Sequence, residues 1–289
     1  MVSAPPACSP PKSPWFERLG PREPETPLVC AVPHGGRIYP AALLGVSAVP
    51  HGILEQLEDR HADLLVARAI EVGAVAVVAR AARAWIDLNR GEEDLDPALR
   101  DPPGSGPPPT ARARSGLGLL PQRVGRRDLW REAPTAESAA ARIASIHRPY
   151  HAAVADALDA ACRRFGHAVL IDCHSMPTLM GLRPARIVIG DLHGRSAGKG
   201  VAAEVARTAR SLGFAAALNA PYAGAYGLAR HGRPADNVHA LQIEVDRALY
   251  LERDMRTPSD GLRRTQGLIA ALARAAVTAA MPPFAIAAE

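Results

Sequence analysis

Short apolar runs that alternate with segments of helical periodicity are the feature that most constrains how this chain can fold. The clearest runs are 28–32, 75–78, 168–171, 187–189 and 240–245, and several are apolar at every position. A strand without polar alternation is buried on both faces, which is typical of a parallel sheet covered by helices. We therefore predict an α/β fold, a single domain with a mixed, largely parallel central sheet flanked by helices.

Segments in which apolar residues recur at helical spacing lie between these runs. Pro149 should end or kink one such helix, because proline lacks the amide hydrogen and clashes with the preceding turn. We also expect Ala84–Leu88 to form a strand, and 91–130, which is rich in Pro, Gly and Arg, to be a long loop. The expected helices are about 52–72, 135–146, 152–165, 197–212 and 261–279.

The first 27 residues are rich in proline and poor in apolar runs, so we expect an N-terminal arm over 1–27 before one domain over 28–289. No run of 18 apolar residues and no secretory signal pattern is present, which favours a cytoplasmic protein without membrane contact. The four cysteines form no C-x-x-C pair, which argues against a thiolate zinc site and favours free thiols. They are Cys8, Cys30, Cys162 and Cys173.

The chain carries a formal net charge of +5. Its arginines are scattered rather than gathered in one segment, and no nucleic-acid-binding motif is present, so we expect no nucleic-acid partner. A basic pocket for a small-molecule carboxylate accounts for a mild positive excess equally well.

Polar side chains stand where several of the expected strands end, and one carboxylate lies inside a strand. Ligands bind at the carboxyl ends of strands in open α/β sheets, and two imidazoles with one carboxylate make a zinc site that stays open to water. A carboxylate within an apolar strand is costly unless it is paired or functional. The residues concerned are His34, Asn89, Arg90, Asp172, His174 and Glu244, with the segment Asp59–Asp63 between the first two strands.

Each of these residues has a plainer interpretation. A single histidine after a strand is often an ordinary loop residue, and Asp59 and Asp63 lie four residues apart, so they can share a solvated helix face. Spacing alone therefore leaves the metal site open.

Seven segments of the chain together resemble the N-formylglutamate amidohydrolase family, and they occur in the family's order from about residue 28 to 253. That family is similar in fold and site layout to zinc carboxypeptidases and aspartoacylase, which implies a phosphorylase- or carboxypeptidase-like domain. The segments are Val32–Arg37, Glu58–Asp63, Trp85–Arg90, His147–His151, Leu170–Pro177, Gly190–Gly194 and Val238–Arg247.

The resemblance implies one zinc ion per chain, held by His34, Asp59 and His174. Zinc carboxypeptidases take their middle ligand from a glutamate three residues after the first histidine, but this chain has Arg37 there, and a guanidinium cannot bind a cation. The family resemblance points to Asp59 instead, with Asp63 and His61 as the alternatives for the middle ligand.

The resemblance further implies that Glu244 is the general base and that Asn89 and Arg90 bind the substrate's carboxylate. Arg148 and Arg230, with His151 and His239, are expected to help bind substrate or orient ligands. The expected reaction is hydrolysis of the amide of an N-acyl amino acid, above all N-formyl-L-glutamate to formate and L-glutamate. Two alternatives remain. One is hydrolysis of another N-acyl amino acid or of a peptide with a free carboxyl end. The other is a non-catalytic relative that binds a metal or a carboxylate.

Overall fold

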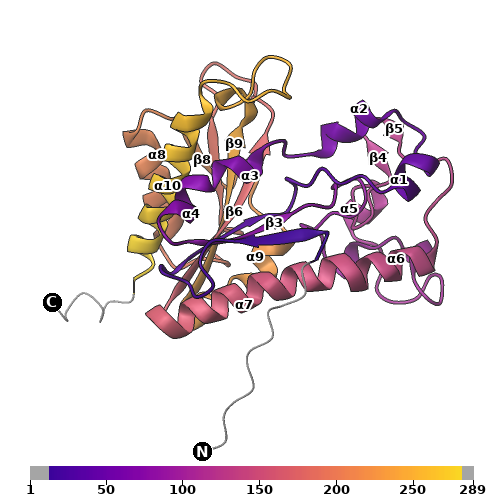
Figure 1. Cartoon of the computed structure of the whole chain (residues 1–289), viewed down its shortest axis with the longest axis horizontal. Helices are drawn as coiled ribbons and strands as arrows, with labels where there is room; N and C mark the ends of the chain where they lie inside the picture. Colours follow the sequence, from indigo (N-terminus) through magenta and orange to yellow (C-terminus); the bar gives the residue numbers. More distant parts are fainter. Residues whose placement is uncertain (1–12, 282–289) are drawn as a thin grey trace, which may run out of the picture.

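The computed structural model describes residues 13–281, and its centre is a seven-stranded sheet in the order β1-β3-β2-β6-β9-β7-β8 (Figure 1). Strands β3, β2, β6 and β9 run parallel, β1 and β7 run antiparallel to their neighbours β3 and β9, and β8 is parallel to β7. This confirms the predicted α/β fold with a mixed, mostly parallel sheet. The strands are β1 (Phe16–Leu19), β2 (Leu28–Val32), β3 (Val75–Ala79), β6 (Ala168–Met176), β7 (Ile187–Gly190), β8 (Ala216–Leu218) and β9 (Val238–Asp246).

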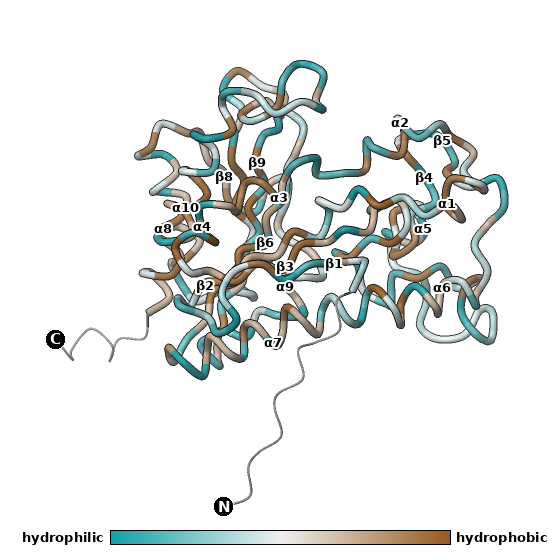
Figure 2. The backbone as a smooth tube through the Cα atoms, viewed as in Figure 1, coloured by the Kyte–Doolittle hydropathy of each residue, from teal (hydrophilic) through white to brown (hydrophobic). Residues whose placement is uncertain are grey.

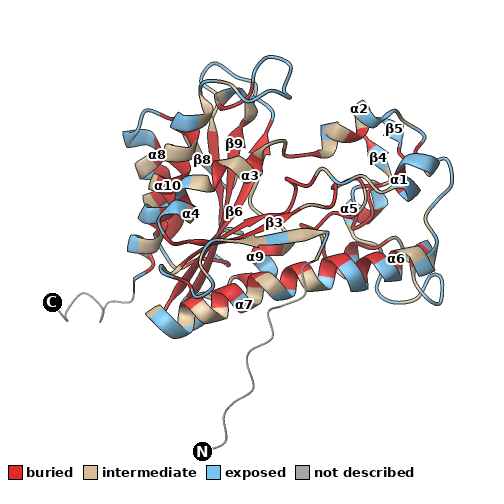
Figure 3. Cartoon of the chain, viewed as in Figure 1, coloured by how far each residue is buried: buried red, intermediate tan, exposed pale blue. Residues whose placement is uncertain are grey.

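Helices cover both faces of the sheet, because the central strands are apolar on both faces. On β2, Cys30 and Val32 pack towards α3 (Ala62–Leu65), α4 (Ala67–Glu71), α8 (Val201–Ser211) and α10 (Leu262–Ala279). Val29 and Ala31 pack towards the other side, which holds α7 (Arg148–Phe165) and α9 (Tyr226–His231). The central strands are therefore hydrophobic in Figure 2 and buried in Figure 3.

A smaller group of short elements extends from one end of the sheet, at the right of Figure 1. Leu43, Leu54 and Leu129 form a separate small core there. The expected loop 91–130 contributes a helix and a two-stranded hairpin to this region. The elements of this smaller group are α1 (Ala41–Val46), α2 (His51–Leu54), α5 (Ala111–Arg114), β4 (Arg123–Val124) and β5 (Arg127–Asp128).

Two of the expected elements are wrong. Residues 84–88 form turns rather than a strand, because the amide of Trp85 bonds to Ala82 O (2.8 Å) and that of Asp87 to Leu119 O (2.8 Å). The expected helix 52–72 is broken into short pieces. Its break lies at Asp59, whose amide bonds to His34 O (2.9 Å), and at His61, whose φ of 59° is left-handed.

Pro149 was expected to end or kink a helix; it does not end one, and the helices expected at 135–146 and 152–165 are continuous. α6 (Ala136–Arg142), a π-helical turn (Ile143–His147) and α7 form one long helix along the lower edge of Figure 1, with Pro149 in the first turn of α7. A π-helical turn widens the backbone just before the proline, so the ring is accommodated without ending the helix.

The structure describes part of the expected N-terminal arm and three of the four cysteines. Strand β1 lies inside the expected arm 1–27, of which residues 1–12 are outside the described residues, as are 282–289. Cys30 and Cys173 are free and buried and Cys162 is free, whereas Cys8 is not among the described residues. Between residues 13 and 281, no helix combines the length and apolar character that a bilayer crossing requires.

Candidate active site

Three buried side chains from distant parts of the chain meet at the carboxyl edge of the parallel strands. His34 follows β2, Asp59 lies in the turn before α3, and His174 lies near the end of β6. Oδ2 of Asp59 is 3.3 Å from Nδ1 of His34 and 2.9 Å from Nδ1 of His174. One donor atom from each residue lies within 4.8 Å of the others, so the group can hold a metal ion. The sequence predicts the same three residues.

A carboxylate lies next to Nε2 of each histidine, but only that of Asp87 forms a hydrogen bond with the ring, since Oδ2 of Asp172 has no hydrogen-bond partner within residues 13–281. Asp87 Oδ1 is 2.7 Å from Nε2 of His34, and Asp172 Oδ2 is 3.1 Å from Nε2 of His174. In the structure, Nδ1 of His174 donates a hydrogen bond to Oδ2 of Asp59 (2.9 Å), and its Nε2 accepts one from Nδ2 of Asn89 (3.2 Å). A cation bound between the two rings and Asp59 would take the place of the proton on that Nδ1. Nδ1 of His34 is buried and has no hydrogen-bond partner among the described residues. Two buried ring nitrogens that face one carboxylate oxygen fit a divalent cation, because the ion would satisfy all three atoms once Nδ1 of His174 has given up its proton.

The second oxygen of Asp59 is held from the opposite side. Oδ1 accepts hydrogen bonds from Nη2 of Arg247 (3.1 Å) and from Oγ of Ser175 (3.2 Å). Burial alone would raise the pKa of Asp59, but hydrogen bonds and positive charge from His174 and His34 hold it well below its usual value. Asp59 is therefore an ionised carboxylate whose Oδ2 is directed at the two imidazoles.

Glu244 lies beside this group on the neighbouring strand, where the parallel register of β6 and β9 pairs it with His174. Gln242 Nε2 donates a hydrogen bond to Oε1 of Glu244 (2.9 Å), which leaves Oε2 for another partner. Burial raises the pKa of Glu244 to about 7, although the charge of His174 acts in the opposite direction. A carboxyl group that titrates near neutrality is suited to proton transfer at neutral pH.

Asn89 and Arg90 reach the same place from the turns after β3. Nδ2 of Asn89 lies 3.2 Å from Nε2 of His174. Arg90 is anchored through Nε to Leu117 O (3.0 Å) and through Nη1 to Asn89 O (2.8 Å), and no described residue accepts a hydrogen bond from its Nη2. The pair therefore places an amide against His174 and a partly free guanidinium near Asp87, whose Oδ2 is 3.9 Å from Nε of Arg90.

Two other arginines predicted to bind substrate make their contacts elsewhere. The exposed Arg148 forms a two-point ion pair with Glu92, with Nε to Oε1 at 2.9 Å and Nη2 to Oε2 at 2.8 Å. The exposed Arg230 bonds through Nη1 to the hydroxyl of Tyr226 (3.2 Å). Their role in substrate binding stays a prediction.

The two alternatives for the middle ligand are engaged in other contacts. Both oxygens of Asp63 pair with Arg37 at 3.1 and 2.9 Å, and Oδ2 also lies 3.2 Å from Nη1 of Arg80. Nε2 of His61 lies 2.9 Å from the carbonyl oxygen of Arg256. Of the three alternatives, the geometry favours Asp59.

Several residues that shape the site have no role predicted from the sequence. Asp87 orients His34 and is itself paired with Arg83, whose Nε is 2.9 Å from Oδ2. Arg247 and Gln242 orient Asp59 and Glu244. Asp87, Arg247 and Gln242 lie inside the segments that carry the family resemblance, whereas Arg83 does not. That location was the one sequence signal that could have indicated a role, because contacts between distant segments depend on packing and leave no local pattern.

Comparison with known proteins identifies the family. A family model described as N-formylglutamate amidohydrolase matches residues 26–251, more than half of the chain. The chain belongs to the N-formylglutamate amidohydrolase family. It is 30% identical over 235 residues to N-formylglutamate deformylase of Pseudomonas aeruginosa, covering 78% of this chain and 82% of that protein. The corresponding enzyme of Pseudomonas putida is 29% identical over 238 residues, with the same shares covered.

One solved structure agrees with this family assignment, and a second shares the fold. The crystal structure of N-formylglutamate amidohydrolase from Ralstonia eutropha JMP134 superposes with a TM-score of 0.80 at 33% identity, covering 92% of this chain and 97% of that one. The gene product Atu2144 from Agrobacterium tumefaciens, at 16% identity and a TM-score of 0.64, shares the fold.

Proposed function

We propose that this amidohydrolase uses one zinc ion to hydrolyse N-formyl-L-glutamate to formate and L-glutamate. The observation that carries the proposal is the convergence of Nδ1 of His34, Oδ2 of Asp59 and Nδ1 of His174 beside the carboxyl group of Glu244. Family membership supports the reaction class, and the relatives named deformylase support the substrate.

Zinc is the metal that this set of donors favours. Two imidazole nitrogens and one carboxylate oxygen match the ligands of catalytic zinc sites, which keep a fourth position open. Zinc in such a site would act as a Lewis acid. It would lower the pKa of water enough to make hydroxide available at neutral pH, and it would polarise the amide carbonyl. Asp87 accepts a hydrogen bond from Nε2 of His34 and so leaves its Nδ1 free for the ion. Asp172, whose Oδ2 lies 3.1 Å from Nε2 of His174, would accept the proton of that nitrogen when the metal takes the place of the proton on Nδ1.

Glu244 moves the proton in this proposal. As water attacks the formyl carbon, the free oxygen of Glu244 accepts the proton of the water, while Gln242 holds the other oxygen. The carbon–nitrogen bond then breaks, and Glu244 returns the proton to the nitrogen of the departing glutamate. The raised pKa of Glu244 suits both directions of this transfer.

Asn89 and Arg90 bind the substrate's carboxylate in this proposal, because an amide and a guanidinium offer the donors that a carboxylate accepts. When metal binding moves the proton of His174 to Nε2, that nitrogen would no longer accept from Asn89, and one hydrogen of its Nδ2 would become available, the other being directed at Oε1 of Gln242 (3.4 Å). Arg148 and Arg230 remain additional predicted contributors, and 28–289 remains the expected catalytic domain of a cytoplasmic enzyme.

The test combines metal analysis with turnover. Purified protein should contain about one zinc per chain, and it should release formate from N-formyl-L-glutamate. Glu244→Gln should keep the metal but lower turnover by a factor on the order of 100 or more, because the amide cannot accept the proton. Glu204→Gln, at a partly exposed position of α8 outside the site, is the matched control and should leave turnover unchanged.

A panel of substrates decides the remaining alternatives. Faster turnover of N-acetyl amino acids or of short peptides would contradict the formyl substrate while keeping the amidohydrolase. Zinc binding with no hydrolysis of any member of the panel would support the non-catalytic alternative. Near-normal turnover by the Glu244→Gln variant would remove Glu244 from the mechanism.

A further inference from the structure

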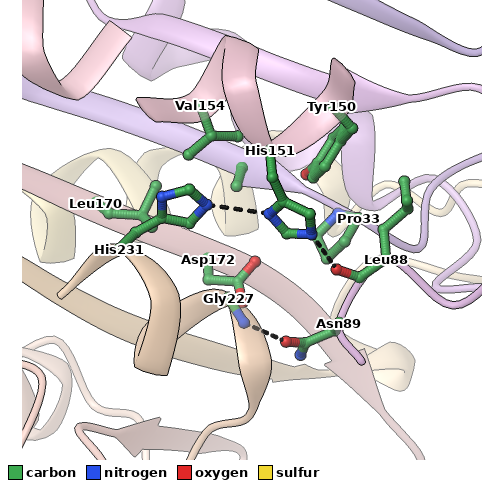
Figure 4. A pocket seen from close by; sticks show the side chains of 11 residues that line it. Pro33, Leu88, Asn89, Tyr150, His151, Val154, Leu170, Asp172, Gly227 and His231 are labelled. Carbon is green, nitrogen blue, oxygen red and sulfur yellow. Dashed lines mark hydrogen bonds between the residues drawn. The ribbon is translucent and has the colours of Figure 1, made fainter. Parts of the chain in front are cut away.

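A group of buried histidines lies behind the site and plays no part in the proposed reaction. His147 and His151 lie one turn apart, in the π-helical turn and in α7, and His231 lies at the end of α9. The ring centroids of His147 and His151 are 4.6 Å apart, and those of His151 and His231 are 5.3 Å apart. Figure 4 shows His151 between His231 and the backbone of Leu88.

The first two histidines hold the backbone on either side of Asn89. Nε2 of His151 is 2.9 Å from the carbonyl oxygen of Leu88, and Nε2 of His147 is 2.8 Å from that of Arg90. A carbonyl accepts only, so each ring must carry its proton on Nε2. Because residues 84–90 form no strand, these two carbonyls have no partner in the sheet. The two histidines supply the hydrogen bonds that a neighbouring strand would otherwise provide.

Helix α9 holds Asn89 in two further ways. The amide of Gly227 donates to Oδ1 of Asn89 (2.9 Å), which directs the Nδ2 group away from α9 and towards His174. One turn later, Nε2 of His231 lies 3.0 Å from Nδ1 of His151. Because the Nδ1 of His151 is an acceptor, His231 must donate, and this fixes the tautomer that bonds to Leu88. Both contacts are drawn in Figure 4.

The space among these side chains leaves no room for a ligand. The cavity that Asn89, His151, Asp172, Gly227 and His231 line has a volume of about 10 Å³, at most enough to admit a single water molecule. Both ring nitrogens of His151 are already bonded. Within residues 13–281, the group of His34, Asp59 and His174 is the one whose geometry suits a metal, so the histidines are not a second metal site.

We propose that His147, His151 and His231 are positioning residues that hold Asn89 and Arg90 in the orientation needed to bind the substrate's carboxylate. The identity of the ligand rests on the proposed function, whereas the positioning rests on the hydrogen bonds that the three histidines form. Burial keeps the rings neutral by lowering the pKa of His147, His151 and His231, and neutral rings are what the donor and acceptor pattern requires.

Substitutions at His151 give the sharpest test. His151→Leu removes the donor to Leu88, whereas His151→Gln can place an amide donor close to the position of Nε2. His167→Leu is the matched control, since His167 is also buried and its ring bonds to a carbonyl, that of Phe165, at the other end of α7. The readouts are hydrogen exchange of the backbone amides of Asn89 and Arg90, zinc content, and kcat and KM for N-formyl-L-glutamate.

Loss of the positioning should give a specific pattern. In His151→Leu we expect amide exchange at 89 and 90 to quicken on the order of tenfold. KM should rise roughly tenfold with kcat within about twofold and the zinc content unchanged. His151→Gln should recover most of both effects, and His167→Leu should show neither. His231→Leu should reproduce the defect of His151→Leu without adding to it in the double variant.

Two outcomes separate the failure of this inference from the failure of the proposed function. Unchanged exchange at Asn89 and Arg90 in His151→Leu would overturn the positioning role, whatever the enzyme hydrolyses. Wild-type protein without activity on N-formyl-L-glutamate would overturn the function instead, and the exchange measurement would still decide whether the histidines hold the segment. An equal rise in KM in His151→Leu and His151→Gln would also contradict the role.

Discussion

Burial lowers the pKa of His231 to about 4, and the positive charge of Arg230 acts in the same direction. The ring is 2% exposed and bonds to His151, so it stays neutral in the folded protein at pH values where an unfolded histidine is already charged. A single side chain thereby links the arrangement behind the active site to the pH dependence of stability.

The expected pH effect has a definite sign. Between an unfolded pKa near 6.5 and the folded value of about 4, the unfolded state binds more protons, so stability falls as the pH falls through this window. On going from pH 7 to pH 4.5, His231 alone should cost about 2–3 kcal/mol of unfolding free energy. Urea unfolding at both pH values should show that His231→Gln loses less stability than wild type by this amount. Equal losses in the two proteins would contradict the prediction.

The sequence predicts the residues of the site better than the contacts that orient them. His34, Asp59 and His174 belong to segments with family resemblance, and the structure brings them together. Asp87 and Arg247 were assigned no role, because their contacts with His34 and Asp59 join residues 53 and 188 positions apart. Residue type and local spacing carry little information on contacts of that range.

At the scale of elements, the predictions hold where burial dictates the pattern. β2, β3, β6, β7 and β9 contain runs that are buried at every position, and each was predicted from its apolar composition. Ala84, Ile86 and Leu88 alternate like a strand and are indeed buried, but turns place them there. Alternation reports burial, and it does not identify which backbone conformation achieves that burial.

The loop that carries His34 depends on close backbone contact with the segment after β3. A Cβ atom at Gly36 would lie 2.6 Å from the carbonyl carbon of Ala81, and the amide of Ile38 bonds to Arg80 O (2.8 Å). Gly36→Ala must therefore displace backbone, and we expect it to lower the unfolding free energy by about 1–3 kcal/mol. Chemical denaturation of the purified variant measures this change.

Gly45 provides the control for that substitution. It lies within α1, and no atom lies within 4 Å of a Cβ added there. Gly45→Ala should be neutral or stabilising by about 0.5–1 kcal/mol, because alanine favours the helix and restricts the unfolded chain. If Gly36→Ala were as well tolerated as Gly45→Ala, the loop would have room that the structure does not show.

In the whole molecule, the site joins parts of the chain that otherwise belong to different layers. His34 follows β2, Asp59 lies before α3, and His174 and Glu244 belong to the two longest strands, β6 and β9. Four carboxylates, those of Asp59, Asp87, Asp172 and Glu244, lie buried within this one region. Their mutual repulsion opposes folding, and a bound cation would offset it.

Removal of the metal should therefore destabilise the entire domain and not only the active site. At a metal concentration about 1,000 times Kd, binding to the folded state alone adds about 4 kcal/mol, which for a domain of this size corresponds to a Tm shift on the order of 10 °C. Thermal unfolding with added zinc and after treatment with a chelator measures the shift. His174→Ala should show a much smaller response to zinc, because two of the three ligands bind a cation weakly. The same Tm with and without zinc would show that the buried group of His34, Asp59 and His174 folds without any help from a cation.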